Sequence, residues 1–274
     1  MIEHTFDAGA VSLNYAAEGR EDGRPLVFLH GVTGRWQAWL PVMTAFAAEW
    51  RVYALDFRGH GRSGRAPSAY RAVDYAADVV AFLRRRVGQP ATVIGHSLGA
   101  IVAIAVAADA PEAVRAVVLE DPPLAVFDDQ EGIIGRPEQP VFTVWRDLAA
   151  AGLPRERLFA ALAEQQPEAV GAALGARTLT LSQMDPDVLT AILENRGREG
   201  YGLAARLRRV ACPVLLQQGN VDLGSAVGDA RVAGARALLA RCAFEYFPDV
   251  GHGIHAGQPF AFCRCVRAFL GALP

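Results

Sequence analysis

The sequence predicts an α/β fold: a mostly parallel, eight-stranded sheet covered by helices on both faces, with a helical insertion after the sixth strand. Three observations lead to this prediction. Short buried apolar segments alternate with helical patterns over residues 1–122, and the alternation resumes over 206–274. Between them, residues 123–205 show helical patterns alone, so we expect a helical cap inserted into one sheet-forming core. Strands that alternate with helices imply right-handed crossovers and a sheet buried on both faces.

The first half of the chain supplies most of the predicted strands. Residues 11–15 alternate apolar and polar side chains as a half-buried strand does, whereas the later strands are continuous apolar runs. The helix over 73–87 ends in three arginines and a glycine, which suit the negative end of the helix dipole and the C-terminal cap. In chain order the predicted strands span 11–15, 25–30, 51–56, 91–95 and 115–120, and the predicted helices 39–50, 73–87 and 98–109.

The second half contains the insertion and the return to the sheet. Within the insertion, residues 155–165, 167–174 and 186–195 have helical periodicity. The sheet pattern then continues with strands at 213–217 and 243–247 and helices at 229–241 and 259–270.

Composition narrows the class of protein. With 52% hydrophobic and 20% charged residues, the chain can bury a large core, and a net charge of −2 without a basic stripe argues against a nucleic-acid partner. All basic residues are arginines, which excludes lysine-based catalysis. The four cysteines fit a reducing cytoplasm, and the N-terminus has no secretory signal. Residues 87–108 carry no charge, but a polar cluster at their centre favours a buried strand and helix over a membrane span.

The most informative motif is Gly95-His96-Ser97-Leu98-Gly99, a G-x-S-x-G between a buried strand and a helix rich in small residues. A serine on such a sharp turn is exposed at the edge of the sheet, and side chains at the two glycine positions would collide with neighbouring elements. The turn also directs the start of the helix at a bound carbonyl group, so the backbone N–H of Leu98 is expected to stabilise an oxyanion.

With this motif and four others, the chain resembles the α/β-hydrolase family over nearly its whole length. Residues 30–34 (HGVTG) are similar to the family's oxyanion loop, and 56–63 (DFRGHGRS) to a loop that is mainly structural. Residues 217–222 (QQGNVD) and 247–253 (FPDVGHG) are similar to the loops that carry the catalytic acid and histidine. The resemblance implies an acyl-enzyme mechanism without a cofactor or metal ion. In it, Ser97 is the nucleophile, His252 the base and Asp222 the acid, and the second oxyanion donor is the N–H of Val32.

Two of these roles have rivals in the sequence. Asp121 ends the sixth strand, where some members of the family carry the acid, although the two prolines after it give the position a structural explanation. His255 lies three residues beyond His252 and could be the base instead, or the two could form half of a metal site that lacks further ligands. His96 adjoins the serine, and we expect it to support the site from behind.

Four aromatic residues are candidates for the lining of a substrate pocket, namely Trp36, Phe127, Phe142 and Trp145, although core packing explains each of them equally well. We expect the substrate to be a small carboxylic ester or a lactone, uncharged or weakly polar. Hydrolysis of a carbon–carbon bond in a diketone uses the same three residues and stays open. The alternative to an enzyme is a module of the same fold that binds a ligand as a sensor and does not turn it over. The oligomeric state is not predictable from these patterns.

Overall fold

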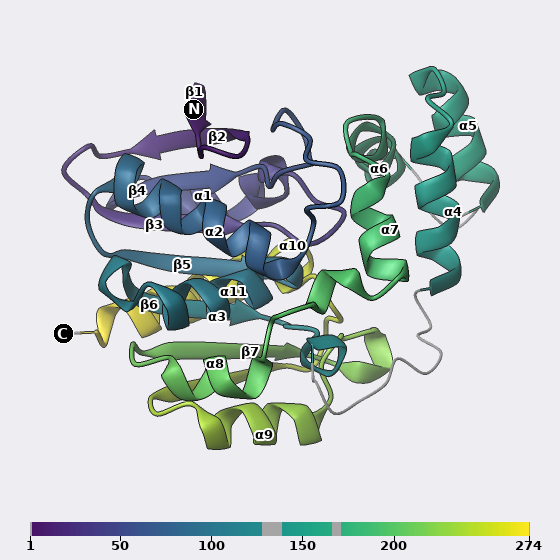
Figure 1. Cartoon of the computed structure of the whole chain (residues 1–274). Coiled ribbons are helices and arrows are strands. Elements are labelled where there is room, and N and C mark those ends of the chain that lie inside the picture. Colours follow the sequence, from purple (N-terminus) through teal and green to yellow (C-terminus); the bar gives the residue numbers. More distant parts are fainter. Residues whose placement is uncertain (1, 128–138, 166–170, 274) are drawn as a thin grey trace.

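The computed structural model describes residues 2–127, 139–165 and 171–273. These residues form an eight-stranded sheet with helices on both faces (Figure 1), which confirms the predicted fold class. The strand order is β1-β2-β4-β3-β5-β6-β7-β8, in which β2 is antiparallel to both of its neighbours and the remaining pairs are parallel. The strands are β1 (Ile2–Asp7), β2 (Ser12–Gly19), β3 (Arg24–Leu29), β4 (Trp50–Leu55), β5 (Ala91–His96), β6 (Val114–Glu120), β7 (Val214–Gly219) and β8 (Cys242–Phe247).

Alternate side chains of the strands feed two separate hydrophobic cores. On β3, Val27 and Leu29 belong to the core beneath α2 and α3, whereas Leu26 and Phe28 belong to the core beneath α1 and α11. Because successive side chains of a strand point to opposite faces, continuous apolar runs are what a doubly covered sheet requires. The covering helices are α1 (Leu40–Phe46), α2 (Ala72–Phe82), α3 (Leu98–Asp109), α8 (Leu203–Arg209), α9 (Asp229–Leu238), α10 (Ile254–Gly257) and α11 (Pro259–Gly271).

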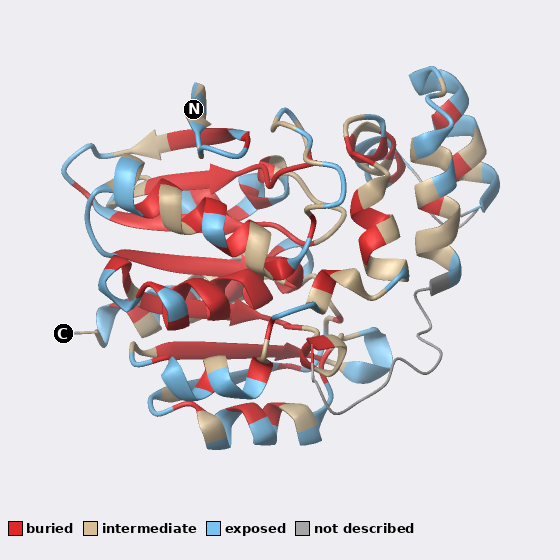
Figure 2. Ribbon diagram, in the orientation of Figure 1, coloured by how far each residue is buried: buried red, intermediate tan, exposed pale blue. Residues whose placement is uncertain are grey.

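The uncharged segment 87–108 folds as predicted, into β5 and α3. Helix α3 is buried from Leu98 to Ala108 (Figure 2), since it packs on the sheet between α2 and α8. A helix that is hydrophobic all round is expected where it is enclosed by protein. No helix in the described part of the chain is both long and apolar enough to cross a membrane.

Two differences from the predicted elements have local causes. Strand β1 lacks an apolar pattern because it is an edge strand whose residues are exposed or half-buried, so the sequence did not reveal it. The helix predicted over 39–50 is shorter: a 3-10 turn spans Trp36–Trp39, and α1 ends at Phe46. The end predicted for the helix over 73–87 is confirmed, because a π-helical turn continues α2 and Gly88 follows in the left-handed conformation.

The described part of the insertion between β6 and β7 consists mainly of helices. Helices α4 (Gln139–Ala150), α5 (Arg155–Gln165), α6 (Ala172–Ser182) and α7 (Asp187–Leu193) lie together beside the sheet (Figure 1). Helix α8 instead packs on α3, so the predicted boundary at 205 falls inside a helix of the sheet layer. Part of the helix predicted over 167–174 lies outside the described residues, and α6 begins at Ala172.

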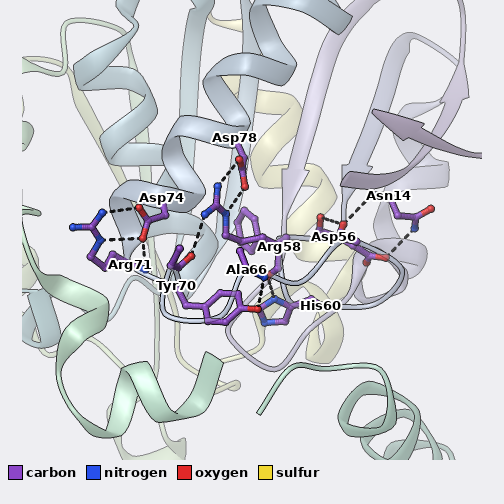
Figure 3. Close-up of polar contacts among 12 residues, drawn as sticks. Asn14, Asp56, Arg58, His60, Ala66, Tyr70, Arg71, Asp74 and Asp78 are labelled. Carbon is purple, nitrogen blue, oxygen red and sulfur yellow. Dashed lines mark hydrogen bonds and ion pairs between the residues drawn. The ribbon is translucent and has the colours of Figure 1, made fainter. Parts of the chain in front are cut away.

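The loop over residues 56–63 is a rigid junction held by buried polar contacts. The carboxylate of Asp56 accepts hydrogen bonds from the side chain of Asn14 and from the backbone of Trp36 and Arg62. Arg58 donates two hydrogen bonds of 2.7 Å to Asp78 on α2 (Figure 3). These contacts hold the loop inside the protein, in agreement with the structural role that the sequence predicted for it.

Removing one member of the buried Arg58–Asp78 pair should be strongly destabilising. Both side chains are about 95% buried, at 5% and 4% exposure, so Asp78→Ala leaves an arginine charge without its partner. We expect the free energy of unfolding to fall by about 3–5 kcal/mol, measured by urea denaturation. Glu112→Ala, which breaks an exposed ion pair with Arg84, is the matched control and should leave the urea midpoint unchanged. Equal small effects of both substitutions would show that the buried pair is not a stabilising junction.

Candidate active site

Ser97 lies at the sharp turn between β5 and α3, as the G-x-S-x-G motif predicts. Its backbone has φ 55° and ψ −118°, a conformation that residues with a side chain rarely adopt. A Cβ atom at Gly95 would collide with the carbonyl of Gly99, and one at Gly99 with the carbonyl of Leu29. The glycines are therefore required by close backbone packing, and that packing fixes the serine at the carboxyl edge of the sheet.

His252 lies in the loop after β8, and the carboxylate of Asp121 holds its ring. The distance from Nδ1 of His252 to Oδ2 of Asp121 is 2.6 Å. Asp121 is fully buried, and it follows β6 with a positive φ of 45°. Its oxygens also accept hydrogen bonds from the backbone N–H of Gly219, the hydroxyl of Ser225 and the backbone N–H of Ala226. A buried carboxylate with four donors is held in one orientation.

Asp121, and not the predicted Asp222, is the aspartate that contacts His252. Asp222 is exposed in a short 3-10 turn, and the structure does not bring its carboxylate to His252. The loop that carries Asp222 instead packs against the loop that carries His252. The backbone N–H of Asn220 donates to the carbonyl of Val250, and its side-chain amide donates to the carbonyl of Pro248. Strands β6 and β7 are adjacent and parallel, so both aspartates reach the same edge of the sheet, and the loop turns Asp222 outward.

A second histidine–carboxylate pair lies behind the first. The backbone N–H of His255 donates to Glu120 at 2.8 Å, and its Nδ1 lies 2.9 Å from each oxygen of that carboxylate. Both residues are buried, and the ring of His255 packs against Trp39 with 4.3 Å between ring centroids. His255, the rival for the role of base, is thus enclosed in the core.

His96 connects the two pairs. Its ring centroid is 4.5 Å from that of His252 and 5.1 Å from that of His255, and its Nε2 lies 2.9 Å from the backbone oxygen of His252. Burial lowers the pKa of His96 to about 3, although the nearby charge of Glu120 opposes the shift. The ring is therefore neutral at pH 7 and supports His252 from behind, as the sequence suggested.

The loop over residues 30–34 packs against the serine. A Cβ atom at Gly31 would lie 3.2 Å from the Cβ atom of Ser97, so the absence of a side chain permits this approach. The carbonyl of Val32 is held by Nε2 of His60 at 2.7 Å. Leu98 begins α3, and the first N–H groups of a helix have no acceptor within it. The two predicted oxyanion donors therefore belong to segments that flank Ser97.

The four aromatic candidates for the pocket have different positions. Trp36 is buried in the core on the α1 side, and its indole N–H donates to Glu3 on the edge strand β1. Phe127 is buried against Tyr201, whose hydroxyl donates to the backbone of α3. Phe142 and Trp145 lie on α4 with their ring centroids 5.8 Å apart.

Arg177 is a residue of the site region that the sequence did not predict. Its guanidinium lies over the ring of Trp145, 3.8 Å from the centroid, and its Nη1 donates to Oγ1 of Thr33 in the loop beside the serine. No sequence signal marked it among the many arginines. Among the described residues, no cluster of three or more histidines, cysteines or carboxylates could hold a metal ion.

Comparison with known proteins identifies the family. The family model described as alpha/beta hydrolase fold matches residues 24–183, and the chain therefore belongs to this family. It is 35% identical over 121 residues to the 2-(acetamidomethylene)succinate hydrolase of Mesorhizobium japonicum, covering 44% of this chain and 43% of that protein. It is 37% identical over 123 residues to epoxide hydrolase B of Mycobacterium tuberculosis (strain H37Rv), covering 44% of this chain and 33% of that one. Both alignments span less than half of the relative's own length.

A solved structure is similar over nearly the whole chain. The enol-lactonase from Burkholderia xenovorans LB400 superposes with a TM-score of 0.76 at 19% identity, covering 98% of this chain and 100% of that one. At this identity the similarity demonstrates the fold alone. The named relatives are hydrolases that act on small molecules, and their different substrates leave the chemistry of this chain to be argued from its site.

Proposed function

We propose that the chain is a serine hydrolase that cleaves a small carboxylic ester or lactone through an acyl-enzyme on Ser97. The observation that carries the proposal is a histidine whose Nδ1 is held by a buried carboxylate and whose backbone oxygen lies 2.9 Å from Nε2 of His96, the residue before the strained serine at the turn into α3. In this proposal His252 is the base and Asp121 replaces Asp222 as the orienting acid.

The proposed mechanism follows from the residue types. Asp121 accepts a hydrogen bond from the Nδ1–H group of His252, so Nε2 of the ring is unprotonated and can take the hydroxyl proton of Ser97. The serine oxygen then attacks the substrate carbonyl, and the backbone N–H groups of Val32 and Leu98 stabilise the oxyanion, each by about 3 kcal/mol. Return of the proton from His252 releases the alcohol, and a water molecule activated in the same way hydrolyses the acyl-enzyme.

Serine at position 97 separates this proposal from the chemistry of some relatives. The resemblance to the α/β-hydrolase family implies that its epoxide hydrolases and dehalogenases carry an aspartate at the position of Ser97 and form an alkyl-enzyme. Diketone hydrolysis and ligand sensing without turnover use the same residues and are the competing functions. The helical insertion, which we propose acts as a cap, would then determine which substrate reaches Ser97.

Covalent labelling combined with a substrate panel tests the proposal. A fluorophosphonate should modify Ser97, located by mass spectrometry of the digested protein. The panel contains p-nitrophenyl esters of increasing chain length, lactones and an aryl diketone. It also contains one ester and one lactone that carry a carboxylate, because one relative is named for a succinate. Turnover of esters or lactones supports the proposal. Cleavage of the diketone alone assigns the competing reaction, and labelling without turnover of any substrate favours a sensor.

A further inference from the structure

Arg177 joins the helical insertion to the loop beside the serine. It projects from α6, and its Nη1 donates a 2.8 Å hydrogen bond to Oγ1 of Thr33. Thr33 is two residues from Gly31, which lies against the Cβ atom of Ser97, so the chain between them spans at most about 7 Å. Together with the hydrogen bond, these lengths place the guanidinium at most about 15 Å from the Cβ atom of Ser97, and the turn closed by the hydrogen bond from the N–H of Gly34 to the carbonyl of Gly31 shortens the path further.

The charge of Arg177 has no counter-ion in the part of the chain that the structure describes. Within residues 2–127, 139–165 and 171–273, the one hydrogen bond that Arg177 donates is to the neutral hydroxyl of Thr33. Burial lowers the pKa of this guanidinium to about 10, so it remains cationic at pH 7. Arg58, by contrast, is buried and is neutralised by two hydrogen bonds to Asp78. A half-buried cation without a carboxylate is costly unless a ligand supplies one.

A second polar group, beside Arg177, has no hydrogen-bond acceptor in the described part of the chain. Trp145 lies under the guanidinium and is 7% exposed, and its indole N–H has no hydrogen-bond partner among the described residues. Buried N–H groups are nearly always hydrogen-bonded, and an unpaired one costs about 1–3 kcal/mol. The cation and this donor come from different helices, α6 and α4, and a carboxylate has oxygens enough to accept from both.

We propose that Arg177 and Trp145 form a carboxylate-binding subsite, and that the substrate carries a free carboxylate a short distance from its scissile ester or lactone bond. This proposal rests on the proposed function and revises the expectation of an uncharged substrate. A guanidinium presents paired N–H donors that match the two oxygens of a carboxylate. Half-esters of short dicarboxylic acids, or lactones that bear a carboxylate, are the substrate class that fits.

The test compares two esters of similar length that differ in charge, mono-p-nitrophenyl glutarate and p-nitrophenyl valerate. Rates are corrected for the reaction without enzyme, because a neighbouring carboxylate accelerates spontaneous hydrolysis. The measured quantity is the ratio of kcat/KM for the charged ester to that for the neutral ester. We expect Arg177→Leu to lower this ratio about 10- to 100-fold, mainly through KM of the charged ester, and Arg177→Lys to restore part of it.

A matched control separates recognition from packing. Arg206 also lies over an aromatic ring, that of Tyr201, but it is paired with Asp109, so Arg206→Leu should leave the ratio unchanged. If Arg177→Leu slows both esters in parallel, the residue holds α6 in place and the proposal is wrong. An unchanged ratio with unchanged rates overturns it as well.

A binding measurement distinguishes this proposal from the proposed function. Calorimetry with monomethyl glutarate compares Ser97→Ala with the double variant Ser97→Ala/Arg177→Leu, neither of which needs to turn over substrate. Binding that is lost in the double variant supports the subsite even if the chain proves not to be an esterase. Hydrolysis of both esters by the wild type, with equal binding of monomethyl glutarate to the two variants, contradicts the subsite alone.

Discussion

Ser97→Ala is expected to lower kcat for an activated ester by about 10⁴-fold or more while the protein stays folded. Ser97 is the proposed site of acyl-enzyme formation, and an alanine has no oxygen with which to form the ester bond. The remaining backbone donors can still bind the substrate, so KM should change much less than kcat. Steady-state kinetics with p-nitrophenyl acetate provides the measurement, and circular dichroism verifies the fold.

Two features make this experiment decisive. The alanine keeps the Cβ atom that packs against Gly31, so the turn before α3 loses a hydroxyl group and little else. Ser225→Ala is a useful comparison, because it also removes a hydroxyl, one that donates to Asp121, and leaves the nucleophile in place. Ser97→Ala with more than a few per cent of wild-type activity would falsify the assignment of the nucleophile.

Asp121→Asn is expected to lower kcat by about 10⁴-fold, whereas Asp222→Asn should change it less than about threefold. The carboxylate of Asp121 accepts from Nδ1 of His252 and so selects the tautomer whose Nε2 can receive a proton. An amide at position 121 can donate to Nδ1 and stabilise the wrong tautomer. Asp222 is exposed and does not contact the ring. The measurement is kcat for both variants at pH 7 to 8 on the same ester.

The controls for this pair address stability. Asp121 is buried and accepts three hydrogen bonds from the end of β7 and the loop after it, so melting temperatures must show that Asp121→Asn is folded at the assay temperature. Labelling of Ser97 by a fluorophosphonate should slow in parallel with kcat, because the same base activates the serine in both reactions. The reverse ranking of the two variants returns the acid to Asp222, and equal moderate losses mean that both carboxylates contribute.

The two histidine–carboxylate pairs share one structural origin. Glu120 ends β6 and Asp121 follows it, while His252 lies two residues before α10 and His255 is in the first turn of that helix. Successive residues at a strand end point in opposite directions, so one carboxylate reaches the loop at the sheet edge and the other enters the core. The pattern of two acids and two histidines was visible in the sequence, but which acid meets which histidine depends on how β6 and α10 pack.

The sequence by itself determined the fold class and the position of Ser97 at the turn between β5 and α3, because both depend on local chain geometry. Apolar runs that are buried on both faces define the parallel strands, and the two glycines around Ser97 are required by contacts within one strand–turn–helix unit and its neighbour β3. Strand β1 was not predicted, because strands were recognised by their apolar patterns and the exposed position of β1 imposes none.

Only the tertiary structure decided which side chains meet. Asp121 and His252 are 131 residues apart, and Thr33 and Arg177 are 144 apart. Two aspartates follow adjacent strands at the same sheet edge, and nothing in their sequence context reveals that the loop after β7 wraps around one and turns the other to solvent. Trp36 and Arg177 could not be placed from the sequence for the same reason. Trp36 is buried near the edge strand, and Arg177 is half-buried without a counter-ion among the described residues. Both properties arise from packing between distant segments, which no local pattern encodes.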